Sequence, residues 1–178
     1  MKTLRIALDI GHVRNAGARG NGIEEHARCE VLAALLAPML EAQGHTVRVF
    51  DFPEMKNDPE INKTVLEVNK WGADVGISLH CDSSENAGAH GAHVMYCSDF
   101  GKQLASPIAY QLTLLLPGRA ERLVKNTRLA MLRATRPAWA YCECGFVSNA
   151  ADAEVLRDHL DEVAAAIARG VKQYAAKL

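Results

Sequence analysis

Apolar and polar residues alternate along this chain in two patterns. Short apolar runs bounded by glycine, proline or small polar residues are typical of buried strands. Longer segments in which apolar residues recur every three or four positions are typical of helices packed on a core. The expected strands are 6–10, 45–50, 74–82, 92–97, 129–132 and 138–145, and the expected helices are 23–43, 61–71, 101–116 and 150–176.

Several residues mark the ends of the expected helices. Gly44 and Gly72 follow two of them and favour a helix C-terminus, because glycine accepts the left-handed backbone that often closes a helix. Asn149 is expected to cap the last helix, with Asp152 placed as in a capping box. Pro38 lies inside the first helix and should kink it, at a cost of roughly 3 kcal/mol where the lost hydrogen bond is not relieved.

This order of strands and helices predicts one α/β domain over residues 1–178. We expect three layers: a twisted, mostly parallel sheet with helices on both faces. The loop 83–91 is too short to hold a crossover helix, so the strand after it should be antiparallel to its neighbour. With 49% apolar residues in 178, the chain can bury a sizeable single core.

Charge and hydropathy exclude several classes of partner. The formal net charge of −1 gives no basic bias toward nucleic acid. No run approaches the length of about 18 apolar residues that a membrane-spanning helix needs, so we expect no membrane insertion. The first residues lack the long apolar stretch and cleavage site of a secretory signal, which predicts synthesis in the cytoplasm.

The five cysteines are odd in number and scattered through the expected strands and helices. This pattern does not predict a disulfide framework. Cys142 and Cys144 are separated by one residue, closer than the spacing of about two to four residues in zinc-knuckle pairs. We expect all five to be buried small side chains of a protein made in a reducing compartment.

Two of the expected strands end in a histidine. His12 follows the strand 6–10 and Gly11, and His80 lies in the strand 74–82. Because parallel strands end at the same edge of a sheet, both imidazoles should lie at that edge, where ligands of open α/β sheets bind. Glu24 and Glu25 lie at the start of the first helix, and either can complement the helix dipole or reach the histidines. A His–Glu–His set is a common zinc site.

Glu143 is the single charged residue of the apolar strand 138–145. Burying an unpaired carboxylate is costly, so such a group usually has a partner or a catalytic task. In a zinc hydrolase that task would be general base toward the attacking water. Cys142 and Cys144 should point to the face of the strand opposite Glu143, so we interpret them as core residues. A cysteine nucleophile would need a nearby activating base, which disfavours this role for Cys81, Cys142 and Cys144.

Four motifs in order resemble the zinc-dependent N-acetylmuramoyl-L-alanine amidases, the peptidoglycan-cutting domains of bacterial autolysins and phage endolysins. They are Asp-Ile-Gly-His12, Gly-Asn-Gly-Ile-Glu-Glu25, Ile-Ser-Leu-His80 and Glu143-Cys-Gly-Phe-Val-Ser-Asn149. The resemblance covers the chain nearly end to end, including Leu-Arg-Ala-Thr-Arg-Pro137.

The resemblance implies one Zn²⁺ ion held by His12, Glu25 and His80, with Glu143 as the catalytic carboxylate. Glu25 is preferred to Glu24 because it shares a helix face with Cys29 and apolar residues beyond it. The implied reaction is hydrolysis of the amide between the lactyl group of N-acetylmuramic acid and L-alanine. Glu143 would take a proton from water and return it to the departing amine.

The chain departs from the family at Val13-Arg14, where relatives usually carry two glycines, so the loop Val13–Gly22 is expected to alter substrate contacts more than catalysis. With no export signal or wall-binding domain recognised, the resemblance is strongest to a phage or prophage endolysin that reaches the wall after release. We expect a monomer. The alternatives are a non-catalytic peptidoglycan-binding module and a zinc peptidase, although His12-Val-Arg-Asn15 lacks the His-x-x-Glu pair of zinc carboxypeptidases.

The remaining ionisable residues of note have simpler interpretations. Each of the other histidines is expected to be structural or exposed rather than functional; these are His26, His45, His90, His93 and His159. Arg128, Arg133 and Arg136 form a modest basic cluster before the last strand. It can contact an acidic stem peptide, but a solvated surface is the simpler interpretation.

Overall fold

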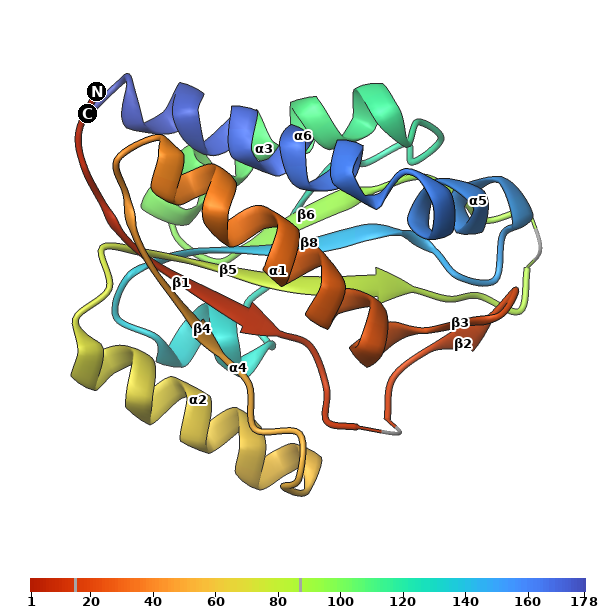
Figure 1. Cartoon of the computed structure of the whole chain (residues 1–178), viewed down its shortest axis with the longest axis horizontal. Coiled ribbons are helices and arrows are strands. Elements are labelled where there is room, and N and C mark those ends of the chain that lie inside the picture. Colours follow the sequence, from red (N-terminus) through yellow and green to blue (C-terminus); the bar gives the residue numbers. More distant parts are fainter. Residues whose placement is uncertain (15, 87) are drawn as a thin grey trace.

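The structure is a computed structural model that describes residues 1–14, 16–86 and 88–178. Asn15 in the loop Val13–Gly22 and residue 87 in the loop 83–91 lie outside the described residues. The main sheet has six strands in the order β4-β1-β5-β8-β6-β7 (Figure 1). In chain order these are β1 (Arg5–Ile10), β4 (Thr46–Phe50), β5 (Val75–Asp82), β6 (His93–Tyr96), β7 (Leu123–Lys125) and β8 (Ala138–Phe146).

Most neighbouring strands of this sheet are parallel. β4, β1, β5 and β8 run parallel to one another, and β6 pairs antiparallel with β8 and parallel with β7. The helices are α1 (Glu25–Ala42), α2 (Asn57–Trp71), α3 (Asp99–Leu115), α4 (Ala130–Ala134), α5 (Ala150–Asp158) and α6 (Leu160–Ala175). α1, α3, α5 and α6 lie on one side of the sheet, and α2 and α4 lie on the other (Figure 1). β6 and β7 therefore run opposite to the other four strands, and the expected three-layer α/β domain with at least one antiparallel strand is confirmed.

Side-chain alternation along the strands builds a core on each side of the sheet. In β8, Ala140, Cys142 and Cys144 face the larger core beneath α1, α3 and α6. Trp139, the residue before Ala140, faces the smaller core beneath α2 and α4, with Phe50 of β4. Each fully buried large side chain of this kind contributes roughly 1.5–3 kcal/mol through burial. The alternation therefore fixes which face of β8 carries Glu143.

The predicted strand 129–132 is wrong. Residues Ala130–Ala134 form the short helix α4, and its buried Met131 and Leu132 pack against the α2 side of the sheet. The remaining strand of the sheet is β7, a three-residue edge strand that was not among the expected strands. A run this short gives little alternation to detect, and α4 is held by packing rather than by helix propensity.

The predicted single helix 150–176 is also wrong in one respect. The backbone leaves the helical region at His159 (φ −132°, ψ 35°), which separates α5 from α6. Asn149 caps α5 as predicted, since its side-chain oxygen accepts from the N–H groups of Ala151 and Asp152. Asp152 does not form a capping box, because its carboxylate accepts from the distant N–H groups of Gly91 and Phe146.

Other element bounds differ from the predictions at their ends. α2 begins at Asn57 and includes Pro59 in its first turn, where proline is tolerated. α1 begins at Glu25 rather than residue 23, and it continues without a break through Pro38. Gly44 and Gly72 both have positive φ, as expected for residues that close a helix.

The segment before α1 forms a small hairpin that the sequence analysis treated as loop and helix. β2 (Arg19–Gly20) pairs antiparallel with β3 (Ile23–Glu24) around a two-residue turn. Asn21 and Gly22 of that turn both have positive φ, as an Asn-Gly turn between strands favours. The Asn21 amide donates to the carbonyl of Val147, 2.8 Å away, so the hairpin is held against the end of β8.

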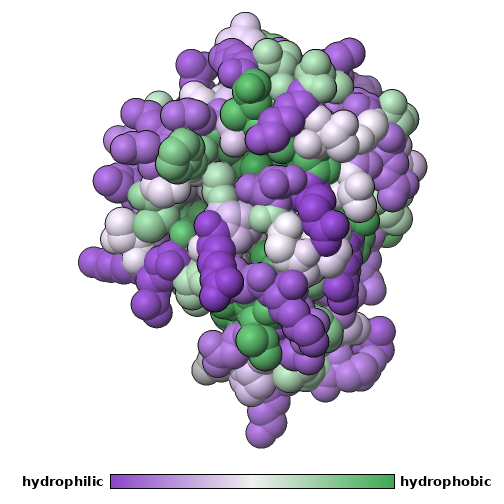
Figure 2. All heavy atoms as spheres, turned by 90° about the vertical axis from the view of Figure 1, so that its left-hand side faces the viewer, coloured by the Kyte–Doolittle hydropathy of each residue, from purple (hydrophilic) through white to green (hydrophobic). Residues whose placement is uncertain are grey.

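The two ends of the chain lie side by side, at the left of Figure 1, where Lys2 N–H donates to the carbonyl of Ala175 (3.1 Å). The face seen from that side is largely hydrophilic, with apolar side chains scattered over it (Figure 2). No helix within the described ranges is long and apolar enough to cross a bilayer.

Candidate metal and catalytic site

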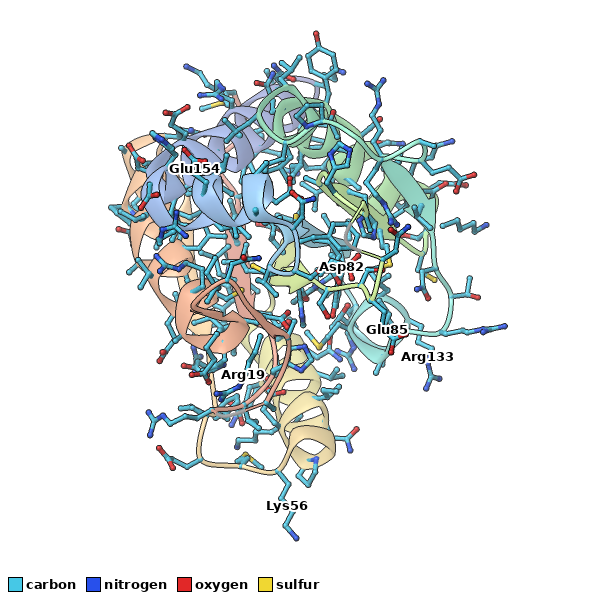
Figure 3. The ribbon with its side chains drawn as sticks, turned by 90° about the vertical axis from the view of Figure 1, so that its right-hand side faces the viewer. Arg19, Lys56, Asp82, Glu85, Arg133 and Glu154 are labelled. Atoms are coloured by element: carbon cyan, nitrogen blue, oxygen red, sulfur yellow. The ribbon has the colours of Figure 1, made fainter. Side chains whose placement is uncertain are left out.

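β1 and β5 end at the same edge of the sheet, and the candidate site lies there. Figure 3 views the molecule from this side, with Asp82 at the end of β5 near the centre. Gly11 continues β1 by donating its N–H to the carbonyl of Leu79, and His12 follows it with φ of +64°. A left-handed conformation is costly for a non-glycine residue and is often found at functional positions.

The first residue of α1 brings a carboxylate to this edge. Glu25 is buried, and its two oxygens accept from the backbone N–H groups of Ala18 (2.6 Å) and Cys81 (3.0 Å). Glu24, in β3, pairs instead with Arg19, 3.2 Å away. The structure therefore brings Glu25, and not Glu24, to the two histidines.

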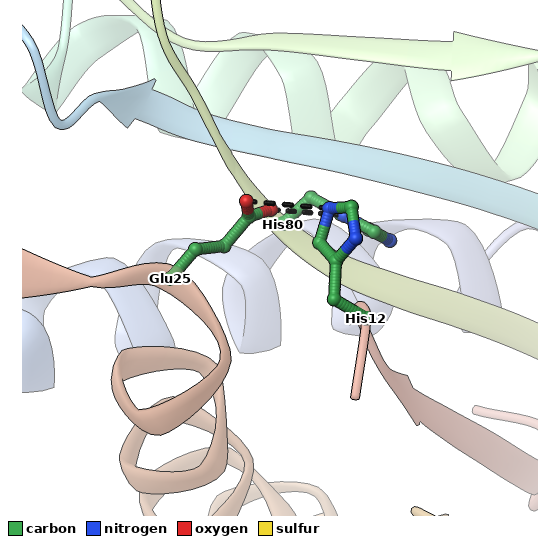
Figure 4. Close-up of side chains that lie close together, drawn as sticks. All are labelled: His12, Glu25 and His80. Carbon is green, nitrogen blue, oxygen red and sulfur yellow. Dashed lines mark hydrogen bonds and ion pairs between the residues drawn. The ribbon is translucent and has the colours of Figure 1, made fainter. Parts of the chain in front are cut away.

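His12, Glu25 and His80 converge into one cluster (Figure 4). Glu25 Oε1 lies 3.0 Å from His80 Nδ1, and Glu25 Oε2 lies 3.3 Å from His12 Nε2. One ligand atom from each residue lies within 4.8 Å of the others. Two imidazole nitrogens and one carboxylate oxygen at these separations are a donor set that suits zinc.

The protonation states of this cluster suit metal binding. Burial alone would raise the pKa of Glu25, but hydrogen bonds with His12 and His80 outweigh it and hold the pKa below its ordinary value. Burial lowers the pKa of His80, although Glu25 opposes this, which favours the neutral imidazole that a metal requires.

Glu143 lies beside this cluster on the neighbouring strand. Its Cα is in register with that of His80, and both side chains line a cavity of about 420 Å³ with His12 and Glu25. Burial raises the pKa of Glu143 well above 4.5, the charges of Asp82 and Glu25 add to the shift, and Arg119 opposes it. Its Oε2 atom is buried and has no hydrogen-bond partner among the described residues.

A sequence profile of the family described as N-acetylmuramoyl-L-alanine amidase matches residues 6–173. The chain belongs to this amidase family. The resemblance inferred from the four motifs is thereby confirmed. A probable cell wall amidase LytH of Staphylococcus epidermidis is 32% identical over 183 residues, covering 98% of this chain and 59% of that protein. The N-acetylmuramoyl-L-alanine amidase LytC of Bacillus subtilis is 26% identical, covering 95% of this chain but 35% of that protein.

Solved structures of the amidase family share the fold. The catalytic domain of the CD27L endolysin targeting Clostridia Difficile superposes with a TM-score of 0.88 at 27% identity, covering 96% of this chain and 97% of that one. The CwlD amidase from Clostridioides difficile superposes with a TM-score of 0.87 at 21% identity, covering 99% and 100% of the two chains. The α/β architecture of the chain is therefore that of the amidases.

The thiols near the site do not fit a nucleophilic role. Cys142 and Cys144 point into the core on the face opposite Glu143, as predicted. Burial raises the pKa of the Cys142 and Cys144 thiols well above their ordinary value, so both stay protonated. A protonated buried thiol is a poor nucleophile.

Two aromatic or imidazole side chains next to the site were not identified from the sequence. Tyr141 stacks on His80 with 4.1 Å between ring centroids. His93 lies opposite Glu143 in the β6–β8 ladder, and burial together with Arg119 lowers the pKa of His93 to about 4. Tyr141 is two residues from Glu143, so the alternation of side chains along a strand predicts that both lie on the same face of β8. The pairing of His93 with Glu143 depends on the register between β6 and β8, which alternation does not give.

Beneath the site, a buried chain of hydrogen bonds connects three strands. Trp139 Nε1–H donates to Ser78 Oγ (2.8 Å), and the Ser78 hydroxyl donates to Asp9 Oδ2 (2.6 Å). Burial raises the pKa of Asp9 to about 7. Asp9 also lines a second cavity of about 220 Å³ that reaches His12 and His80 from the α2 side. This network holds the strands that end in the two histidines.

His45, His159 and the basic cluster have ordinary surroundings. His45 Nδ1 accepts from the N–H of Leu4, and His159 pairs with Glu162 on the surface. Arg128, Arg133 and Arg136 are exposed. Arg133 points outward, away from Asp82 (Figure 3). The exposure agrees with a solvated surface.

Gly11 is expected to be essential for the position of the His80 ring. A Cβ added at Gly11 would lie 2.2 Å from Cε1 and 2.5 Å from Nε2 of His80, so Gly11→Ala must displace the imidazole. We expect zinc affinity to fall by about 10–100-fold, as when the support of a metal ligand is lost. Competition with a chromophoric chelator measures this. Gly88→Ala, whose Cβ would meet only the Asn86 side chain at 3.2 Å, is the control and should bind zinc normally.

Proposed function

We propose that this chain hydrolyses the amide bond between the lactyl group of N-acetylmuramic acid and L-alanine in peptidoglycan, with one zinc ion as cofactor. The observation that carries the proposal is the convergence of His12, Glu25 and His80 in one cavity with Glu143, whose Oε2 atom has no hydrogen-bond partner among the described residues. Membership of the amidase family supports the same substrate. The proposed catalytic unit is residues 1–178.

His12, Glu25 and His80 would hold the zinc ion. When bound, the ion would polarise the scissile carbonyl and lower the pKa of the attacking water. Glu25 is fixed by two backbone N–H groups, and the His80 ring is stacked on Tyr141, so little reorganisation is needed when the ion binds.

Glu143 would carry the proton. Its carboxylate would accept a proton from the attacking water and then donate it to the departing alanine nitrogen, which is a poor leaving group without it. The raised pKa of Glu143 favours uptake of the proton from water, and it keeps the carboxyl protonated until the departing nitrogen accepts that proton. A divalent cation at the neighbouring cluster would oppose the rise and favour the ionised form needed first.

Two alternatives are less well supported. In a non-catalytic peptidoglycan-binding module, the Glu143 carboxyl would bring no benefit. Burying its Oε2 atom without a hydrogen-bond partner among the described residues destabilises the fold. A zinc peptidase that cuts within the stem peptide would use the same donor set, and the products of digestion distinguish it.

The proposal extends to a lytic role on the cell wall, in the manner of an endolysin. The support is the 27% identity with the CD27L endolysin catalytic domain over nearly all of both chains. The protein would act as a monomer on peptidoglycan.

The test is digestion of purified peptidoglycan followed by identification of the new chain ends. We expect free L-alanine amino termini, loss of their release after zinc is removed with a chelator, and recovery on adding Zn²⁺. New D-alanine or diaminopimelate ends would instead identify a peptidase. Binding to peptidoglycan with no new ends of any kind would identify a binding module and would overturn the proposal.

A further inference from the structure

A second cluster of potential ligands lies beside the first and has no part in the proposed reaction. His26 and Glu30 occupy successive turns of α1, and Asp51 follows the end of β4. His26 Nε2 lies 3.8 Å from Asp51 Oδ1 and 3.9 Å from Glu30 Oε1. Their ligand atoms all lie within 4.8 Å of one another. We refer to these three residues as the His26 cluster.

The tautomer of His26 is set by its other nitrogen. His26 Nδ1 lies 3.1 Å from the carbonyl oxygen of Gly11. A carbonyl oxygen only accepts hydrogen bonds, so Nδ1 must carry the hydrogen. In a neutral imidazole this leaves a lone pair on Nε2, directed at the two carboxylates. The same arrangement, in which one ring nitrogen donates to a carbonyl and the other is free, is usual for metal-binding histidines.

Two of the atoms that face one another in this cluster have no hydrogen-bond partner among the described residues. The side chain of His26 is 1% exposed, and within the described part of the chain neither His26 Nε2 nor Asp51 Oδ1 has a hydrogen-bond partner. The Glu30 side chain is 42% exposed and that of Asp51 is 20% exposed, whereas the atoms His26 Nε2 and Asp51 Oδ1 are buried. A lone pair and two carboxylates are all acceptors, so bringing them together at a partly buried position is costly unless a positive charge lies between them. Either a proton on Nε2 or a metal cation can supply that charge.

We infer that His26, Glu30 and Asp51 form a second divalent-cation site, distinct from His12, Glu25 and His80, that takes an ion such as Zn²⁺ or Mn²⁺. One imidazole and two carboxylates suit these ions by donor type. Their total charge of −2 matches a divalent ion. With metal–ligand bonds of about 2.0–2.2 Å, two ligand atoms of one ion can lie up to about 4.2 Å apart. The distances from His26 Nε2 to Asp51 Oδ1 and to Glu30 Oε1 are both below this limit.

The surroundings of Asp51 agree with a cation at this position. Burial raises its pKa, His26 opposes the shift, and Glu30 adds to it. A divalent ion would remove the mutual repulsion of the two carboxylates and satisfy the oxygen that has no partner. Arg14, whose charge lowers the pKa of Asp51, is already paired with Glu54.

The site would have a structural effect rather than a part in the chemistry. An ion bound there would join the end of β4 to the first turns of α1. Through the contact of His26 with the Gly11 carbonyl, it would also stabilise the turn that carries His12. We therefore expect the second ion to raise the melting temperature of the chain.

The test counts ions in variants that leave His26 and its contact with Gly11 unchanged. Wild type and the double variant E30Q/D51N are dialysed against excess Zn²⁺, or Mn²⁺ in a parallel experiment, and bound metal per chain is measured by mass spectrometry. We expect wild type to retain one ion more than the double variant with at least one of these metals. Anomalous scattering from crystals soaked in the same metal should place that ion within about 2.2 Å of His26 Nε2.

The matched control is Glu41→Gln, which removes an exposed acid from the far end of α1 and should retain the wild-type count. Circular dichroism and thermal melting establish that the variants are folded. Equal counts in wild type and the double variant with both metals would overturn the inference and assign the charge to a proton on His26. Loss of an ion in the control as well would also overturn it. The result is a difference between variants, so it does not depend on whether His12, Glu25 and His80 bind zinc.

Discussion

Replacing Glu143 by glutamine is expected to lower kcat for release of L-alanine ends by about 10²–10⁴-fold, the usual contribution of a positioned general acid–base group. Glutamine keeps the size of the side chain but can neither take a proton from water nor return one to the amine. Because Glu143 does not belong to the His12–Glu25–His80 cluster, zinc content should stay at the wild-type level. Parallel digestion of peptidoglycan and metal analysis measure both quantities.

The dependence of activity on pH gives a second test of the catalytic role of Glu143. Burial raises the pKa of Glu143 well above 4.5, so the acid limb of kcat/KM should lie above pH 4.5 and activity should fall as pH drops through it. The residual activity of Glu143→Gln should lack this limb. Glu85→Gln, an exposed acid at the rim of the same edge (Figure 3), is the control and should behave as wild type. Unchanged activity in Glu143→Gln would exclude Glu143 from the mechanism.

Replacing Glu25 by glutamine is expected to lower zinc affinity by more than about 100-fold. Loss of a residue that only positions a metal ligand costs about 10–100-fold in affinity, and loss of the ligand itself should cost more. The neutral amide cannot supply the anionic carboxylate whose two oxygens face the two imidazoles. Hydrolysis should fall with the bound zinc and recover only in part at high metal concentration. Zinc titration and peptidoglycan digestion on the same preparations check this expectation.

The neighbouring glutamate provides an unusually close control. Glu24 differs from Glu25 by one position in the chain, yet it pairs with Arg19 rather than facing His12 and His80. Glu24→Gln should therefore bind zinc normally. If Glu24→Gln lost the metal and Glu25→Gln kept it, the assignment of the carboxylate ligand would be reversed.

The location of the candidate site was predictable because it depends on sheet topology. Two apolar runs that each end in a histidine place both imidazoles at one edge whatever the details of packing. The choice of Glu25 over Glu24 was also contained in the sequence, because the face that carries Glu25 continues through Cys29, Leu32 and Leu36, all of which are buried. The helical period therefore predicts that Glu25 points toward the buried face of α1.

Other features depended on contacts that no local pattern records. The left-handed backbone of His12 is unfavourable for its residue type, so the surrounding fold must impose it. The pairing of His93 with Glu143 follows from β6 lying antiparallel beside β8. The break at His159 separates two segments that are each helical by composition, so their periodicity predicts one continuous helix. The Asn21-Gly22 turn was recognisable and was overlooked because the hairpin strands beside it have only two residues each.

The position of the two chain ends has a practical consequence. They meet on the side of the molecule opposite the one at which β1 and β5 end (Figure 1). The cavity lined by His12, Glu25, His80 and Glu143 lies at those strand ends. A module fused to either terminus would therefore be tethered away from the cavity and leave it accessible to a polymeric substrate. The Lys2–Ala175 contact also means that a short linker can join the termini. A circular permutant with new ends in an exposed loop is thus a reasonable scaffold for attaching a targeting domain at a chosen distance from the cleavage site.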